Sequence, residues 1–126
     1  MLASTSVHPT LPVVDLERAK KFYVETLGLK VIKEDPSPGA VLQAGGGTKL
    51  YLYQRAATKT DHTVAGFTVD DVEAAVAGLK ARGVVFQELD IPGMGIKTIN
   101  GVASFGDIKA AWFSDTEGNV LAVGNN

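Results

Sequence analysis

Two stretches of the chain share one order of hydrophobic and polar positions. Apolar side chains recur at helical spacing after Asp15 and again after Asp71, at Leu16, Ala19, Phe22, Tyr23 and Leu27, then at Val72, Ala75, Val76 and Leu79. Each stripe stops at a glycine, Gly28 or Gly83, which suits the left-handed residue that ends a helix. Asp15 is expected to cap the first helix. For the second helix, Asp70 with Glu73 resembles a capping box if Asp70 is the cap.

Short apolar or alternating segments surround both helices and predict strands. The expected strands are residues 7–13, 29–34, 40–44, 48–54, 62–69, 84–88, 109–114 and 119–123. Two turns, 45–47 and 115–118, would close the last hairpin of each half. The predicted fold class is α+β, with two tandem β-α-β-β-β modules at about residues 5–56 and 61–126. Both belong to one domain of 126 residues, because neither half buries enough apolar surface alone.

The second half carries extra chain between its helix and its last hairpin. This insertion, residues 90–106, is rich in glycine and shows little periodicity. We expect it to form a rim or lid of a binding site, because long connections between packed elements frequently carry function. Met94 and Phe105 would supply its apolar contacts.

Composition and charge exclude several classes of function. The chain has no cysteine, which removes disulfides, thiolate nucleophiles and Cys-ligated zinc. Its formal net charge of −2 indicates neither a nucleic-acid nor a membrane partner. No apolar run approaches the roughly 20 residues of a membrane helix, and the first residues lack the pattern of a signal peptide. The expected location is the cytoplasm.

Two motifs bracket the chain. The opening motif is Leu11-Pro12-Val13-Val14-Asp15-Leu16-Glu17-Arg18-Ala19, and the closing one is Ala111-Trp112-Phe113-Ser114-Asp115-Thr116-Glu117-Gly118-Asn119-Val120-Leu121. Together they resemble the vicinal oxygen chelate superfamily, which includes glyoxalases, bleomycin-resistance proteins and extradiol dioxygenases. The resemblance implies paired modules whose mixed sheets curve into a cup that holds a ligand. It also implies a homodimer, because a partner subunit often completes such cups.

Metalloenzymes of that superfamily bind their metal through His, Glu or Gln side chains on the cup strands. Carried over to this chain, the four ligand positions are His8, Tyr51, Val64 and Ala122. Valine and alanine have no ligand atom. A two-residue slip that replaced Val64 by His62 would still leave too few ligands for a catalytic site. The resemblance therefore implies no metal and no other cofactor.

Strand alternation predicts which further side chains line the cup. Gln43 and Tyr53 share the face of Tyr51. In the second half Phe113 would share the face of Ala122, while Trp112 would point toward a helix. The candidate ligand contacts are His8, Gln43, Tyr51, Tyr53, His62, Val64, Met94, Phe105, Phe113 and Ala122.

Two function classes stay open. The first is a metal-free protein that binds a small organic ligand in an aromatic cup, by antibiotic-type sequestration. The second is a lyase- or isomerase-type enzyme of the glyoxalase family, with His8 as a base or as part of an atypical metal site. Simpler interpretations compete with both, since His8 can be a hydrogen-bonded strand histidine and Tyr51 and Tyr53 can be core or dimer-interface aromatics.

Overall fold

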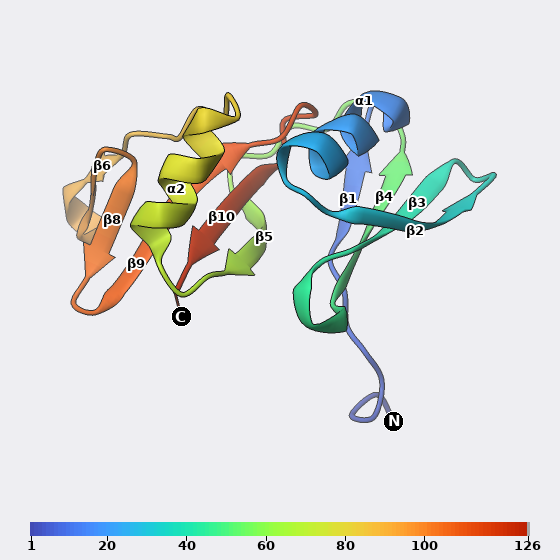
Figure 1. Ribbon diagram of the computed structural model, residues 1–126, viewed down its shortest axis with the longest axis horizontal. Coiled ribbons are helices and arrows are strands. Elements are labelled where there is room, and N and C mark those ends of the chain that lie inside the picture. The colour runs from blue at the N-terminus through green and yellow to red at the C-terminus, as the bar shows by residue number, and fades with distance from the viewer. Residues whose placement is uncertain (126) are drawn as a thin grey trace. The chain divides into compact units, whose positions relative to one another are not determined.

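In the computed structural model, which describes residues 1–125, the chain divides into two units. Unit 1 is Met1–Thr58, and unit 2 is the chain from Lys59 onward. Each unit has one mixed sheet with a helix packed on one of its faces (Figure 1). The α+β fold class predicted from the sequence is confirmed.

Unit 1 has the predicted β-α-β-β-β order. Its elements are β1 (Thr10–Val13), α1 (Leu16–Lys21), β2 (Lys30–Asp35), β3 (Gly39–Gln43) and β4 (Lys49–Gln54). A π-helical turn, η1 (Phe22–Thr26), prolongs α1, and a 3₁₀ turn, η2 (Gly45–Gly47), joins β3 to β4. The strand order is β1-β4-β3-β2, with β1 parallel to β4 and the other pairs antiparallel.

Alternation along the strands of unit 1 separates a buried face from a half-exposed one. Leu11, Leu42 and Leu52 are fully buried, together with Ala19 and Tyr23 of the helical segment. Fully burying such a side chain stabilises the fold by roughly 1.5–3 kcal/mol. The helix therefore covers one face of the sheet, and the residues between these leucines lie on the opposite face.

The predicted start and end of the first helix are confirmed. The Asp15 carboxylate accepts a hydrogen bond from the Arg18 backbone N–H at 3.1 Å, as an N-cap does. Gly28 follows the helical segment with φ of 81°, a left-handed conformation that other residues adopt at a cost.

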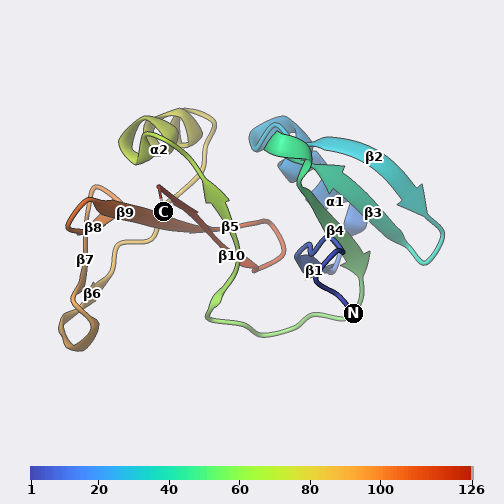
Figure 2. The ribbon, with the colours of Figure 1, turned by 90° about the horizontal axis from the view of Figure 1, so that it is seen from below.

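Unit 2 repeats this plan and extends it. Its elements are β5 (Thr63–Thr68), α2 (Val72–Ala81), β6 (Asp90–Ile91), the 3₁₀ turn η3 (Pro92–Met94), β7 (Ile96–Ile99), β8 (Val102–Phe105), β9 (Ile108–Ser114) and β10 (Val120–Gly124). The strand order is β5-β10-β9-β8-β7-β6. The first four strands of this sheet, β5-β10-β9-β8, follow the same order as β1-β4-β3-β2 in unit 1. Figure 2 shows α2 on one side of β5, β9 and β10.

The insertion differs from the sequence prediction. Residues 90–106, which were expected as a rim or lid and for which no strand was predicted, form three strands at the far end of the sheet. Asn100 and Gly101, with φ of 54° and 85°, make the tight turn between β7 and β8. The strands between these glycines are too short for an alternation of apolar and polar residues to be recognised in the sequence. The Asn-Gly pair, however, is itself a strong hairpin signal.

The strand predicted at residues 84–88 is also corrected. This segment forms only an isolated bridge, Phe86 to Phe113, and a hydrogen bond from the Gln87 N–H to the Trp112 carbonyl at 2.8 Å. Its neighbour β8 pairs with the first part of β9 instead. The apolar residues Val84 and Phe86 are buried because they pack on the core, not because they belong to a long strand.

The cap of the second helix is Asp71, so the condition for a capping box of Asp70 with Glu73 is not met. The Asp71 carboxylate accepts from the Ala74 N–H at 3.0 Å, and its carbonyl accepts from the Ala75 N–H at 3.0 Å. The carbonyl bond is the first of the helix ladder, and it places Asp71 at the boundary. Gly83, with φ of 93°, stands after the helix end, as expected.

Candidate functional site

The clearest candidate surface is the sheet face of unit 1 opposite α1, which we call the tyrosine face. On β1, β3 and β4 it is formed by Thr10, Pro12, Gly39, Val41, Gln43, Lys49, Tyr51 and Tyr53. The rings of Tyr51 and Tyr53 are stacked, with centroids 6.4 Å apart and planes 12° from parallel. Both side chains are half-buried. The strand register therefore places Gln43, Tyr51 and Tyr53 on one face of the sheet, as predicted.

The hydroxyl of Tyr51 is held in place by residues from the β2–β3 hairpin. It donates to Asp35 Oδ2 at 2.9 Å and lies 3.2 Å from Ser37 Oγ. Ser37 also donates its hydroxyl and its backbone N–H, the latter at 3.0 Å, to Asp35 Oδ1. A tyrosine whose hydroxyl proton already has an acceptor presents its free lone pair and ring face to a ligand.

Gly39 gives the Tyr51 ring its space. A Cβ atom at Gly39 would lie 2.2 Å from the Tyr51 hydroxyl oxygen and 2.7 Å from Cζ. Those separations are far below any real contact, so only glycine leaves the ring where it is. The sequence pattern pointed to Tyr51 but not to Asp35, Ser37 or Gly39, whose roles depend on pairing across β3.

The same network sets the charge of Asp35. Hydrogen bonds from the Ser37 hydroxyl, from the Ser37 backbone and from the Tyr51 hydroxyl lower the pKa of the Asp35 carboxyl group, in that order of importance. Each of these donors stabilises the ionised form. Asp35 is consequently a carboxylate at neutral pH and acts as the fixed acceptor for Tyr51.

In unit 2 the corresponding half-exposed face carries Trp112 and not Phe113. Ala122 pairs with Trp112, and Leu121 pairs with Phe113, in the β9–β10 register. Phe113 is fully buried and makes an edge contact with Phe86, with ring centroids 5.3 Å apart. Phe113 was predicted to share the half-exposed face of Ala122. That prediction was wrong, because Phe113 lies on the buried face.

The physical reason is the length of the closing turn. Asn119 was counted as the first residue of the last strand, but the structure places it in the turn. Asp115 Oδ1 accepts from the Glu117 and Asn119 N–H groups, and the Asn119 side-chain amide donates to Asp115 Oδ2, all at 2.8 Å. One residue more in the turn exchanges the two faces of the strand. These bonds also show that the Asp115 carboxylate stabilises the closing turn predicted at residues 115–118.

The other predicted contacts are scattered at the edges of their units. His8 precedes β1 and is exposed, whereas it was expected inside the strand. His62 precedes β5, where its exposed ring lies 3.0 Å from the Thr60 hydroxyl. Val64 lies at an irregularity in the β5–β10 pairing. Met94, in η3, is 69% exposed, and Phe105, at the end of β8, is 40% exposed.

The residues do not fit a catalytic metal site. Of the four positions that the superfamily uses, Val64 and Ala122 supply no ligand atom, and the Tyr51 hydroxyl is bonded to Asp35. Within residues 1–125, no three His, Asp or Glu side chains gather closely enough to hold an ion. Three protein ligands and an open position are the usual requirement for such a site.

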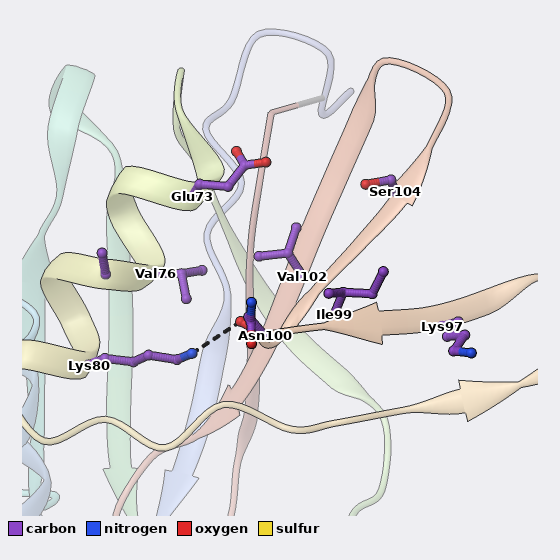
Figure 3. A pocket seen from close by; sticks show the side chains of 9 residues that line it. Glu73, Val76, Lys80, Lys97, Ile99, Asn100, Val102 and Ser104 are labelled. Carbon is purple, nitrogen blue, oxygen red and sulfur yellow. Dashed lines mark hydrogen bonds between the residues drawn. The ribbon is translucent and has the colours of Figure 1, made fainter.

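A second surface, which sequence reasoning missed, is a pocket in unit 2. It has a volume of about 610 Å³ and lies between α2 and the β7–β8 hairpin (Figure 3). Its lining is Glu73, Val76, Ala77, Lys80, Lys97, Ile99, Asn100, Val102 and Ser104. Pockets of about 300–1,000 Å³ are typical of small-molecule sites. It was missed because the side of the pocket facing α2 belongs to the insertion, for which no strands were predicted.

Comparison with protein families decides the classification. Residues 5–123 match the family described as Glyoxalase/Bleomycin resistance protein/Dioxygenase superfamily. The chain belongs to this superfamily. Its two motifs and its repeated sheet order agree with that membership. A search of curated protein sequences found no significant match.

Solved structures of similar fold include proteins connected with antibiotics. TnmS3, an antibiotic binding protein from Streptomyces sp. CB03234, is 28% identical, with 95% of each chain covered and a TM-score of 0.59. FosX, a fosfomycin resistance protein from Listeria monocytogenes, is 16% identical over 98% of this chain and 91% of its own, with a TM-score of 0.73. UcmS2 is 19% identical, with 98% of each chain covered and a TM-score of 0.74. The last two show the superfamily fold alone.

Neither helix in the described part of the chain is long and apolar enough to cross a membrane.

Proposed function

We propose that this member of the superfamily binds a small organic ligand of the antibiotic type, without a metal ion, on its tyrosine face. The stacked pair of Tyr51 and Tyr53 carries the proposal, because it gives this face two half-exposed, nearly parallel rings. By the resemblance to the superfamily, Tyr51 stands at a position where metalloenzymes have a metal ligand. Aromatic rings offer a large contact area at low cost in conformational entropy.

Two further observations support a binding role. The Tyr51 hydroxyl is fixed by Asp35 before any ligand arrives, so the site is preorganised and little ordering is needed on binding. The 28% identity to an antibiotic binding protein over nearly the whole chain agrees with the same kind of role. The ligand expected from this surface has a flat aromatic part, which can lie on the rings, and a donor group for the Tyr51 oxygen.

The test is a ligand-stabilisation series followed by calorimetry. The probes are bleomycin and other natural-product antibiotics with planar rings, with fosfomycin as a non-aromatic comparison, each with and without Mn²⁺. Binding to the native state raises stability by about 2.7 kcal/mol at a ligand concentration 100 times Kd. We expect stabilisation by a planar aromatic antibiotic that does not depend on Mn²⁺. Stabilisation by fosfomycin and Mn²⁺ together, and by no aromatic compound, would contradict the proposal.

Variants then locate the site. Tyr53→Ala should weaken the binding of a hit at least about tenfold, as loss of an aromatic anchor does. Tyr51→Phe keeps the ring and should weaken only ligands that donate to the hydroxyl. The matched control is Val85→Ala in unit 2, an apolar residue that is 84% exposed and outside the tyrosine face. Equal losses in Tyr53→Ala and Val85→Ala would argue against this face.

The alternative is an enzyme that uses His8 as a base or in an atypical metal site. His8→Ala separates the two, since it should leave binding to the tyrosine face nearly unchanged. Loss of a turnover activity in His8→Ala would favour the enzyme. Metal found in stoichiometric amount in the purified protein would favour the version with an atypical metal site.

A further inference from the structure

The pocket between α2 and the β7–β8 hairpin has an apolar floor. Val76 from the helix is buried, Val102 is half-buried, and Ile99 is 70% exposed beside them. Figure 3 shows Val76, Ile99 and Val102 near the middle of the lining, with charged side chains around them. An isoleucine left this exposed next to a concave apolar surface gains by being covered.

The charge around that floor is unevenly compensated. Glu73 is paired with Lys109 of β9, which lowers the pKa of the Glu73 carboxyl group and keeps it ionised but neutralised. Lys80 donates to the Asn100 carbonyl at 3.1 Å and has no carboxylate partner among the described residues. Lys97 faces Asp90 across the β6–β7 pair but forms no ion pair with it. Two ammonium groups therefore border the pocket without a direct counter-charge.

These features together select the chemistry of a ligand. An anionic head group can meet Lys80, whose ammonium has donors beyond the one bonded to Asn100. An apolar body can cover Val76, Ile99 and Val102. A neutral ligand would leave the ammonium groups unmatched, and a small polar anion would leave the floor in water. An amphipathic molecule supplies both the anionic group and the apolar body.

We propose that this pocket is a second binding site, separate from the tyrosine face, for a soluble amphipathic carboxylic acid. Its carboxylate would lie at Lys80, and its hydrocarbon part would lie along Val76, Val102 and Ile99 toward Lys97, at the opposite end of the lining (Figure 3). The site is built within unit 2 alone, from α2, β7 and β8.

The experiment is a titration of the full chain with decanoate, followed by calorimetry and by amide chemical shifts. Decanol supplies the apolar body without the charge, and acetate supplies the charge without the body. We expect decanoate to bind at least tenfold more tightly than decanol, acetate not to bind, and the shifts to fall on α2, β7 and β8. Shifts confined to the tyrosine face, or equal affinity for decanol, would overturn the site while leaving the proposed function untouched.

Variants test the two halves of the argument. Lys80→Gln with Lys97→Gln should weaken decanoate binding about tenfold and leave decanol binding unchanged. Ile99→Ser, at an exposed position that tolerates the change, should weaken both. Lys21→Gln, at an exposed position of α1 in unit 1, is the matched control and should alter neither. If the double lysine variant binds decanoate as tightly as the control variant does, the ammonium groups are not needed for binding and the proposal is overturned. Phosphatidylglycerol vesicles form a last arm, in which binding to vesicles without binding of free decanoate would also overturn the proposal.

Discussion

At the scale of single residues, the role of Tyr51 depends on neighbours that are distant along the chain. Its ring position requires Gly39, and its hydroxyl is bonded to Asp35 and lies beside Ser37. The residue that the resemblance assigns to a metal-ligand position is thus a tyrosine whose hydroxyl proton already has an acceptor. The distinction lies in side-chain surroundings, which no single residue type reveals.

Gly39→Ala tests the space beneath the ring. The new Cβ must displace the Tyr51 side chain, which is flexible at its far end, so the free energy of unfolding should fall by about 1–3 kcal/mol and the Tyr51 ring resonances should shift. The control is Gly78→Ala in α2, where a Cβ meets nothing within 4 Å. That change should stabilise the protein by up to about 1 kcal/mol. Similar urea midpoints for the two variants would contradict the explanation.

The acid titration of Asp35 gives a second prediction at this scale. Because its pKa is lowered in the folded state, the stability it contributes is present above the unfolded pKa, about 3.9, and is lost as pH falls through the folded pKa. Ser37→Ala removes the hydroxyl that matters most, so the Asp35 pKa should rise toward the ordinary value. Carboxyl chemical shifts followed against pH measure it. An unchanged Asp35 pKa in Ser37→Ala would refute the assigned cause.

At the scale of elements, caps and turns decide where helices and hairpins begin. The second helix starts at Asp71 because that residue supplies both the first ladder carbonyl and the capping carboxylate. The sequence alone does not distinguish them, because Asp70 and Asp71 are adjacent and both side chains can cap a helix. In the same way Asp115 and Asn119 determine the length of the closing turn, and with it the face of every residue in β9.

Replacing each aspartate in turn distinguishes the two caps. Asp71→Ala should lower the free energy of unfolding by about 1 kcal/mol, as the loss of an N-cap does. Asp70→Ala, one position earlier and exposed, should change it by less than about 0.5 kcal/mol. Chemical denaturation of both variants measures the difference. A larger loss in Asp70→Ala would restore the capping box that the sequence suggested.

At the scale of the whole molecule, the chain is a duplication in which the second copy has grown. The order β1-β4-β3-β2 returns as β5-β10-β9-β8, and β7 and β6 extend that second sheet. Within that extension, β7 supplies Lys97 and Ile99 to the lining of the pocket beside α2. The added chain therefore contributes to a surface on the helix side of the second sheet.

Assembly is the prediction that belongs to this scale. A homodimer is expected from the resemblance to the superfamily, in which a second subunit often completes the ligand cup. Sedimentation equilibrium should give a mass close to twice the 13.2 kDa of the chain. A monomer at micromolar concentration, with ligand affinity unimpaired, would show that the tyrosine face works without a partner.

The sequence by itself determined the superfamily, the two halves, both helices and the shared face of Gln43, Tyr51 and Tyr53. These follow from periodicity, turn residues and motifs, which act over a few neighbouring positions. Only the tertiary structure decided that Trp112 and not Phe113 faces outward, that Asp35 reaches Tyr51, and that a pocket opens beside α2. Strand register and packing across the sheet control these features, and a one-residue change in a turn reverses a face without altering the pattern that predicted the strand.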